Sequence, residues 1–316
     1  MTATMASGRT LRREFTRFED DDRRVLGAVR FVNDVDGTPI QAPLEIIAAP
    51  PPPGQAPDPA SALPVRVLRN RYGLQVIQAA RGFEDYAAQF EPPPSEPARE
   101  SRFARLRVVD PSGQFLPADF IVRLPRSHRS QDPNHPTVFD PVVVRLLPAP
   151  AGPEDPGWTI LRALVWRLVA APTAANPNAT RAVPLPGALV RVLRAADNLR
   201  LGRGLTEWRP RRGAPSAAAE ALVAVWGLPV TNWTDTADAA VLSGRHAVTI
   251  EARFDPAFDP ARAGTVPDAD VLETGGGGIV ARALPAPISL TARARATLHL
   301  TFDPDLQLAQ AQPIQT

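Results

Sequence analysis

The sequence has 316 residues with 37 prolines, 20 glycines and no cysteine, and all 35 basic residues are arginine, because lysine is absent. Proline makes up about 12% of the chain, against ~5% in typical soluble proteins, and an interior proline costs a helix about 3 kcal/mol. A mainly helical protein is therefore excluded, whereas 44% hydrophobic residues and a net charge of only +2 indicate a folded chain. The lack of cysteine excludes disulfides, thiol nucleophiles and sulfur-ligated zinc sites.

The charged residues do not point to a nucleic acid or to a membrane. Arginine is interleaved with aspartate and glutamate along most of the chain, so no basic face for nucleic-acid binding is expected. No run of about 20 apolar residues occurs, and residues 1–22 lack the apolar middle of a signal peptide. We therefore predict no nucleic-acid partner, no membrane insertion and a cytoplasmic location, with release as part of an extracellular particle left open.

In chain order, residues 1–24 are predicted to form a polar N-terminal arm. Within it, Leu11, Phe15 and Phe18 would share one face of two helical turns at i, i+4, i+7 spacing. Such a face can dock on its own domain, which we favour, or on a neighbouring subunit. These three side chains are therefore candidates for an interaction surface.

From residue 25 to residue 147 the pattern predicts a meander of short strands. Apolar runs are interrupted by turn residues, as at 33–39 and 70–73. The proline-rich stretches 50–64 and 91–98 are too stiff and too poor in N–H donors for a sheet interior, so they are predicted loops or linkers. The predicted strands are 25–32, 40–48, 65–68, 74–77, 103–109, 120–124 and 142–147.

Residues 148–156 (PAPAGPEDP) form the predicted domain boundary. The second half then starts like the first. Residues 158–169 are predicted to be a strand, although a helical face also fits, and residues 183–192 repeat the proline-led strand at 38–46. Further predicted strands are 221–225, 248–254, 288–290 and 297–302.

Short, regularly spaced strands with turn signals predict an all-β fold of tandem β-sandwich domains, Ig-like or prealbumin-like, with long proline-rich loops. The first sandwich region is expected at residues 25–150, as a module at 25–95 followed by the strands of 100–150. The second sandwich is expected at residues 151–316.

Three stretches of the first module carry a family resemblance: residues 25–29 (VLGAV), 36–40 (DGTPI) and 70–76 (NRYGLQV). They resemble the first strand, the start of the second strand and a hairpin of the carboxypeptidase regulatory-like domain, a small prealbumin-like β-sandwich. The insertion at 50–64 departs from that pattern. The resemblance implies a non-catalytic module of the kind attached to secreted enzymes, transporters, adhesins and phage-tail-like particles, and it transfers no active-site residues.

The tripeptide Phe-Asp-Pro occurs four times, at residues 139–141, 254–256, 258–260 and 302–304. We interpret each copy as a strand end, where Phe is the last core residue, Asp caps the turn and Pro blocks further pairing. The alternative is a calcium site, which has no supporting motif spacing. Its oxygens would come from Asp255, Asp259, Asp268 and Asp270. No metal or other cofactor is predicted.

No nucleophile elbow, phosphate-binding loop or dinucleotide motif occurs, and the glycine run 275–278 is interpreted as a loop tip. His128 and His135 lie in a predicted loop whose spacing matches no zinc motif, so a contact loop is favoured over a metal site. All five tryptophans lie in the second half. We expect Trp158, Trp166 and Trp226 in the core or an interface, and Trp208 and Trp233 at the surface.

These observations predict a protein that is not an enzyme but a structural or interaction subunit of a larger bacterial assembly. A phage-tail-like contractile injection particle is the assembly we name first, with other protein subunits, including further copies of the chain, as partners. One alternative is a carbohydrate-binding or adhesin-like module that uses Trp208 and Trp233. Another is a hydrolase with His128 or His135 in an unrecognised active site.

Overall fold

The computed structural model describes residues 25–49, 65–80, 102–124, 126, 140–174, 176–207, 219–228, 231–233, 241–259, 266–303 and 308–315. Within these ranges the chain is almost entirely β, with a single short helix, α1 (Ala269–Thr274). The predicted all-β, sandwich-type fold is confirmed. No helix in the described part of the chain is long and apolar enough to cross a membrane.

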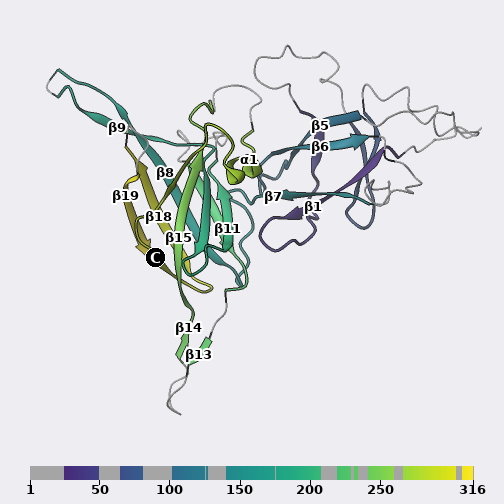
Figure 1. The fold of residues 1–316 in the computed structure, drawn as a ribbon. Helices are drawn as coiled ribbons and strands as arrows, with labels where there is room; N and C mark the ends of the chain where they lie inside the picture. The colour runs from purple at the N-terminus through teal and green to yellow at the C-terminus, as the bar shows by residue number, and fades with distance from the viewer. Residues whose placement is uncertain are drawn as a thin grey trace, which may run out of the picture.

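The strands before residue 150 form an N-terminal lobe of two sheets (Figure 1). A four-stranded sheet has the order β3-β4-β1-β7, in which β1 and β7 are parallel, and a three-stranded antiparallel sheet has the order β2-β5-β6. Their bounds are β1 (Gly27–Asn33), β2 (Glu45–Ala48), β3 (Arg66–Arg69), β4 (Gln75–Ala79), β5 (Arg102–Val109), β6 (Ala118–Leu124) and β7 (Val142–Leu146).

The core of the N-terminal lobe lies between these two sheets. Alternate residues of β6 are buried, because successive side chains of a strand point to opposite faces. Phe31 of β1 and Phe120 of β6 meet edge to face across the core, with ring centroids 5.7 Å apart. The strand predicted at 120–124 therefore places its apolar, alternate side chains in the core between the two sheets.

The strands after residue 158 form a C-terminal lobe (Figure 1). One sheet has the order β11-β10-β15-β16 with β17 also on β15, and the other has the order β12-β8-β18-β19 with β9 also on β8. Their bounds are β8 (Thr159–Ala170), β9 (Thr180–Pro184), β10 (Leu189–Arg194), β11 (Arg200–Leu205), β12 (Glu220–Val225), β15 (Arg245–Phe254), β16 (Val280–Ala283), β17 (Ile288–Thr291), β18 (Arg295–Phe302) and β19 (Leu308–Gln315).

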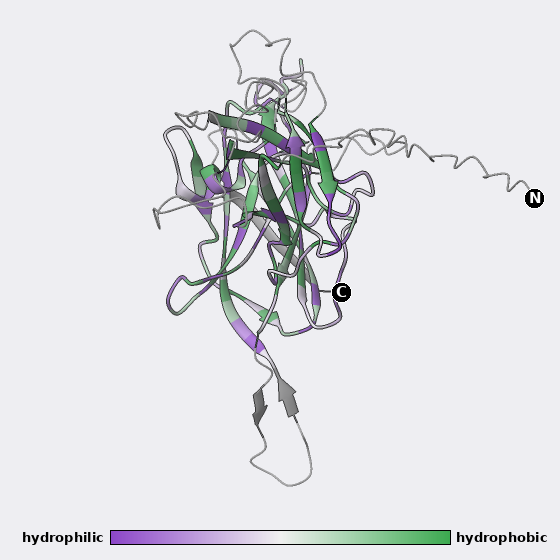
Figure 2. Ribbon diagram, turned by 90° about the vertical axis from the view of Figure 1, so that its right-hand side faces the viewer, coloured by the Kyte–Doolittle hydropathy of each residue, from purple (hydrophilic) through white to green (hydrophobic). Residues whose placement is uncertain are grey.

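Two ribbons extend from the C-terminal lobe. The pair β13 (Thr231–Trp233) and β14 (Val241–Ser243) projects from one end, and β9 with the end of β8 projects from another (Figure 1). Hydrophobic residues run along the strands of the two lobes, whereas hydrophilic residues are common in the connecting turns (Figure 2).

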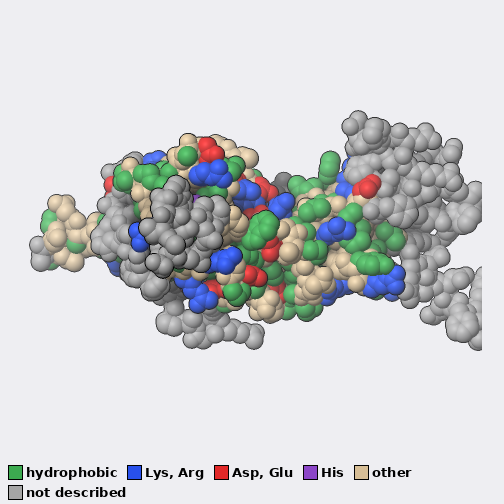
Figure 3. All heavy atoms as spheres, turned by 90° about the horizontal axis from the view of Figure 1, so that it is seen from below, with side chains coloured by type: hydrophobic (Ala, Val, Ile, Leu, Met, Phe, Trp, Pro, Cys, Tyr) green, Lys and Arg blue, Asp and Glu red, His purple; other side chains and the backbone are tan. Residues whose placement is uncertain are grey.

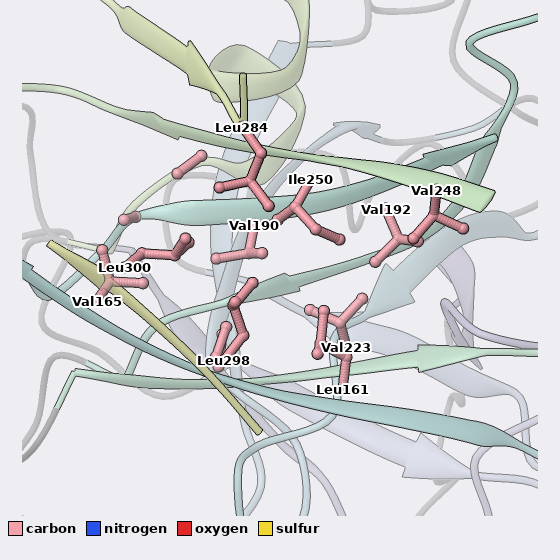
Figure 4. Close-up of a cluster of buried hydrophobic side chains, with 14 of the residues drawn as sticks. Leu161, Val165, Val190, Val192, Val223, Val248, Ile250, Leu284, Leu298 and Leu300 are labelled. Carbon is pink, nitrogen blue, oxygen red and sulfur yellow. The ribbon is translucent and has the colours of Figure 1, made fainter. Parts of the chain in front are cut away.

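The core of the C-terminal lobe is a layer of aliphatic side chains between the two five-stranded sheets. Leu161, Val223 and Leu298 come from one sheet and face Val190 and Ile250 from the other (Figure 4). All five are at most 1% exposed, so this layer supplies much of the apolar burial that stabilises the lobe.

The predicted place of Phe in Phe-Asp-Pro, as the last core residue of a strand, is confirmed at two positions. Phe254 and Phe302 end β15 and β18, are buried, and meet with ring centroids 5.3 Å apart. Phe258 does not end a strand but packs in a cluster between the lobes. The copy at residues 139–141 begins outside the described residues.

The two lobes share a packed junction. Leu116 and Leu147 of the N-terminal lobe pack with Leu189, Leu205 and Leu272 of the C-terminal lobe. The first part of the predicted boundary, residues 148–150, is buried at this junction rather than exposed. The strands group on either side of that boundary, and the division into domains stays a prediction.

Candidate interaction site: the groove between two strand edges

A pocket lies where the two lobes meet, and we call it the junction groove. Its volume is about 1030 Å³, and it is lined by β6, β7, the end of β11 and the start of α1. That volume reaches the upper end of the ~300–1000 Å³ range of ligand pockets. The groove is therefore large enough to receive a peptide segment or a small molecule.

Two open strand edges form one side of the groove. Within the described residues, β6 pairs only with β5 and β7 pairs only with β1. The segments next to these strands are joined at one end, where Leu116 N–H donates to Leu147 O at 2.9 Å and Ala149 N–H donates to Gln114 O at 2.8 Å. At the other end, Arg126 N–H, just after β6, donates to Leu26 O, just before β1, at 2.8 Å. Between these two contacts no described strand pairs with the outer edges of β6 and β7, whose backbone donors and acceptors suit a further strand.

The outward side chains on the two edges follow the same pattern. Ile121 and Val143 are exposed by 62% and 55%, and both line the groove. Two residues further along each strand stand Arg123 and Arg145, both exposed. Neither arginine has a hydrogen bond or ion pair within the described chain. An exposed apolar side chain followed by an unpaired arginine thus occurs on each edge.

The acidic residue on this side of the groove is already neutralised. Asp119 of β6 accepts from Arg107 Nε at 2.6 Å and from Arg105 Nη2 at 3.0 Å. Arg107 is buried, so its bidentate pairing with Asp119 satisfies a guanidinium that would otherwise be costly to desolvate. The charges that remain free along β6 and β7 are therefore positive.

An ion cluster centred on Arg203 forms the opposite wall. Arg203 of β11 bonds Asp34 of the N-terminal lobe through Nε at 2.8 Å and Nη2 at 3.0 Å, and both side chains are about 5% exposed or less. Its Nη1 donates to Asp270 and Glu273 of α1. Burial opposes the charged form, but the hydrogen bonds and charge of Asp34 and Asp270 raise the pKa of Arg203 above its usual range. One guanidinium thus ties both lobes and the helix together.

Helix α1 was not predicted from the sequence, in which the glycine run 275–278 is interpreted only as a loop tip. Asp268 is its N-cap and accepts from the backbone N–H groups of Asp270 and Val271. Gly275 ends it at φ 74°, a left-handed conformation that favours glycine. An Asp before and a Gly after a short apolar stretch are the signals that could have identified it.

A buried aspartate fixes the turn that leads into β6. Asp110 accepts from the backbone N–H of Ser112 at 2.9 Å, of Gln114 at 2.8 Å and of Phe115 at 3.0 Å, and from the Ser112 hydroxyl at 2.6 Å. This turn places Leu116 and Pro117 at the end of the groove.

We expect Asp110→Ala to lower the free energy of unfolding by about 2 kcal/mol, because buried donors would lose a charged acceptor. The matched control is Asp36→Ala, since Asp36 makes a similar but exposed turn to Thr38. It should cost less than about 1 kcal/mol. Urea unfolding followed by tryptophan fluorescence measures both, and equal losses would contradict the expectation.

Most of the predicted interaction residues cannot be placed in this groove. Residues outside the described part of the chain are Leu11, Phe15, Phe18, His128, His135 and Trp208. The backbone of Trp233 ends β13, on a ribbon that projects from the C-terminal lobe, and its side chain is not among those described. These surface predictions stay predictions.

Two of the three tryptophans expected in the core or an interface, Trp158 and Trp226, have different surroundings. Trp158 is buried and packs with Ile160, Leu222 and Ala224, against which Val35 of the other lobe also rests. Trp226 is 61% exposed, so it does not lie in the core, and its place in an interface stays a prediction. Trp226 lies one residue after the end of β12, so the apolar sequence continues beyond the last residue of the strand.

The calcium alternative has no support from the described aspartates. Asp255 accepts from the N–H of Ala257 at 2.8 Å, Asp268 caps α1, and Asp270 pairs with Arg203. No group of three or more His, Asp or Glu side chains that could hold a metal occurs within the described ranges. The turn interpretation is confirmed for Asp255, whereas the capping role of Asp268 was not predicted.

The fold and the groove define an all-β, sandwich-type protein in which two strands that end their described sheets, β6 and β7, line one groove. Comparisons of the chain with protein-family models, with curated proteins and with solved structures give no match. The resemblance to the carboxypeptidase regulatory-like domain therefore stays a prediction.

Proposed function

We propose that this protein is a non-catalytic structural or interaction subunit of a larger assembly, and that it contacts a neighbouring subunit through the junction groove. One observation carries the proposal: two open strand edges lie beside exposed Ile121 and Val143 at the junction of the lobes. Open edges recruit further strands through main-chain hydrogen bonds, and exposed apolar side chains add burial on contact.

The surface charge agrees with a protein partner. Arginines and carboxylates are interleaved on the face shown in Figure 3, without the large basic field that nucleic-acid binding needs. Among bacterial assemblies, a phage-tail-like contractile injection particle is the one we propose first. Its support is the resemblance of residues 25–76 to modules found in such particles.

The absence of cysteine allows a direct test of this contact. Ile121→Cys and Val143→Cys each introduce a single thiol that can carry a benzophenone photocrosslinker. After coexpression with the products of neighbouring genes, we expect covalent adducts to a partner subunit from both positions. Mass spectrometry of the adducts identifies the partner and the site of contact.

The matched control is Ala182→Cys, an exposed position on β9 away from the groove. It should give adducts at no more than background. A protein that stays strictly monomeric, with no adduct from position 121 or 143, would refute the proposed function.

A further inference from the structure

The outward side chains of β6 and β7 indicate what kind of segment would pair with the edges beside the groove. We infer that the occupant is an extended segment of a partner protein in which an apolar residue and an aspartate or glutamate stand two positions apart, on the same side of the strand. This inference rests on the proposed function and adds the chemistry of the partner.

The exposed apolar residue and the arginine on each strand are spaced so that they face the same side. Ile121 and Arg123 stand two residues apart on β6, and Val143 and Arg145 stand two apart on β7. Because residues i and i+2 of a strand point to the same side, each apolar residue and its arginine face outward together. A strand added to either edge would place alternate side chains beside them.

The exposed side chains around these residues on the two sheets carry positive charge. On the three-stranded sheet, Arg123 lies opposite Phe103, which is 76% exposed, and Ile121 lies opposite Arg105. On the four-stranded sheet, exposed Arg30 lies opposite Val143. Of these arginines only Arg105 has a carboxylate partner, Asp119. The outward faces of β6 and β7 are thus apolar and positive, whereas the carboxylates of Asp268 and Asp270 line the groove from its opposite wall.

Cross-strand pairing energies favour an acidic and apolar segment at these edges. Cross-strand pairs of opposite charge and apolar cross-strand pairs each contribute about 0.2–1 kcal/mol, whereas like charges placed opposite one another are unfavourable. An added strand with Glu near Arg123 or Arg145 and Val or Ile near Ile121 or Val143 satisfies both conditions. A segment with lysine in place of glutamate satisfies only the apolar one.

The experiment uses the full chain and two fluorescein-labelled peptides. One is Gly-Val-Thr-Glu-Thr-Val-Thr-Glu-Gly, in which Val and Glu fall on the same side of the strand, and the other has lysine in place of glutamate. We expect the glutamate peptide to bind at least about tenfold more tightly in fluorescence anisotropy, and the preference to weaken at high ionic strength. The double variant Arg123→Glu with Arg145→Glu should reverse the preference.

The control is Arg181→Glu, which removes an exposed arginine on β9 and should leave the preference unchanged. Thermal unfolding of each variant checks that it folds. If the lysine peptide binds wild type as well as the glutamate peptide, or if neither binds, the inference is overturned. In that case, adducts from Ile121→Cys would still support the proposed function, so the two failures can be told apart.

Discussion

Arg203→Met should lower the free energy of unfolding by about 3–5 kcal/mol, the largest single effect expected in this molecule. The substitution leaves the Asp34 carboxylate, which is 5% exposed, buried without its cation. It also releases Asp270 and Glu273 of α1 from the junction. Urea unfolding measured by circular dichroism gives the size of the loss.

Two further variants identify the cause. Replacing both members, Arg203→Met with Asp34→Leu, should recover at least half of the loss, because a buried pair replaced by apolar side chains leaves no uncompensated charge. Arg194→Met removes an exposed pair with Asp197 and should change the stability by less than about 0.5 kcal/mol. A wild-type unfolding midpoint for Arg203→Met would contradict the role assigned to this residue.

Gly204→Ala should cost about 3 kcal/mol, because two sheets of the C-terminal lobe approach each other at this point. A Cβ on Gly204 would lie 2.2 Å from Leu222 O and 2.8 Å from Leu222 C of β12, which are backbone atoms that cannot move aside alone. Gly202 on the same strand has a similar contact, 2.6 Å from Ala224 O. The lowered stability should appear in both thermal and urea unfolding.

Gly277→Ala is the matched control for Gly204→Ala. A Cβ at Gly277 meets nothing within 4 Å, and its φ lies outside the left-handed region. Its effect should stay within about 0.5 kcal/mol. Equal stability of the two variants would show that β11 and β12 do not pack as closely as described.

Much of the strand pattern could be predicted because the buried strands alternate or run apolar. The strand chosen over a helix at 158–169 is confirmed as β8, and residues 248–254 lie within β15. The strands that were not predicted are β11, β13, β14, β16 and β19. Two of them, β11 and β19, have a clear physical reason. The glycines of β11 suggest a loop, yet they permit its close packing on β12. Pro313 argues against β19, yet β19 is an edge strand, where proline is tolerated.

The candidate site could be predicted less well than the fold. Strand periodicity places Ile121 and Val143 on outward faces, but it does not tell which strands end a sheet, because that depends on long-range pairing. The pairing of Arg203 with Asp34 joins residues 169 positions apart, and no local pattern signals it. The groove therefore emerges only from the way the two lobes meet.

The most direct test of the central claim is hydrogen exchange of the protein alone and within its assembly. We predict that amide protection rises on assembly over β6 (Ala118–Leu124) and β7 (Val142–Leu146), whose edges would then be paired. Protection over β9 (Thr180–Pro184) should stay the same. Unchanged exchange over β6 and β7 in the assembled state would contradict the claim that this groove is the contact site.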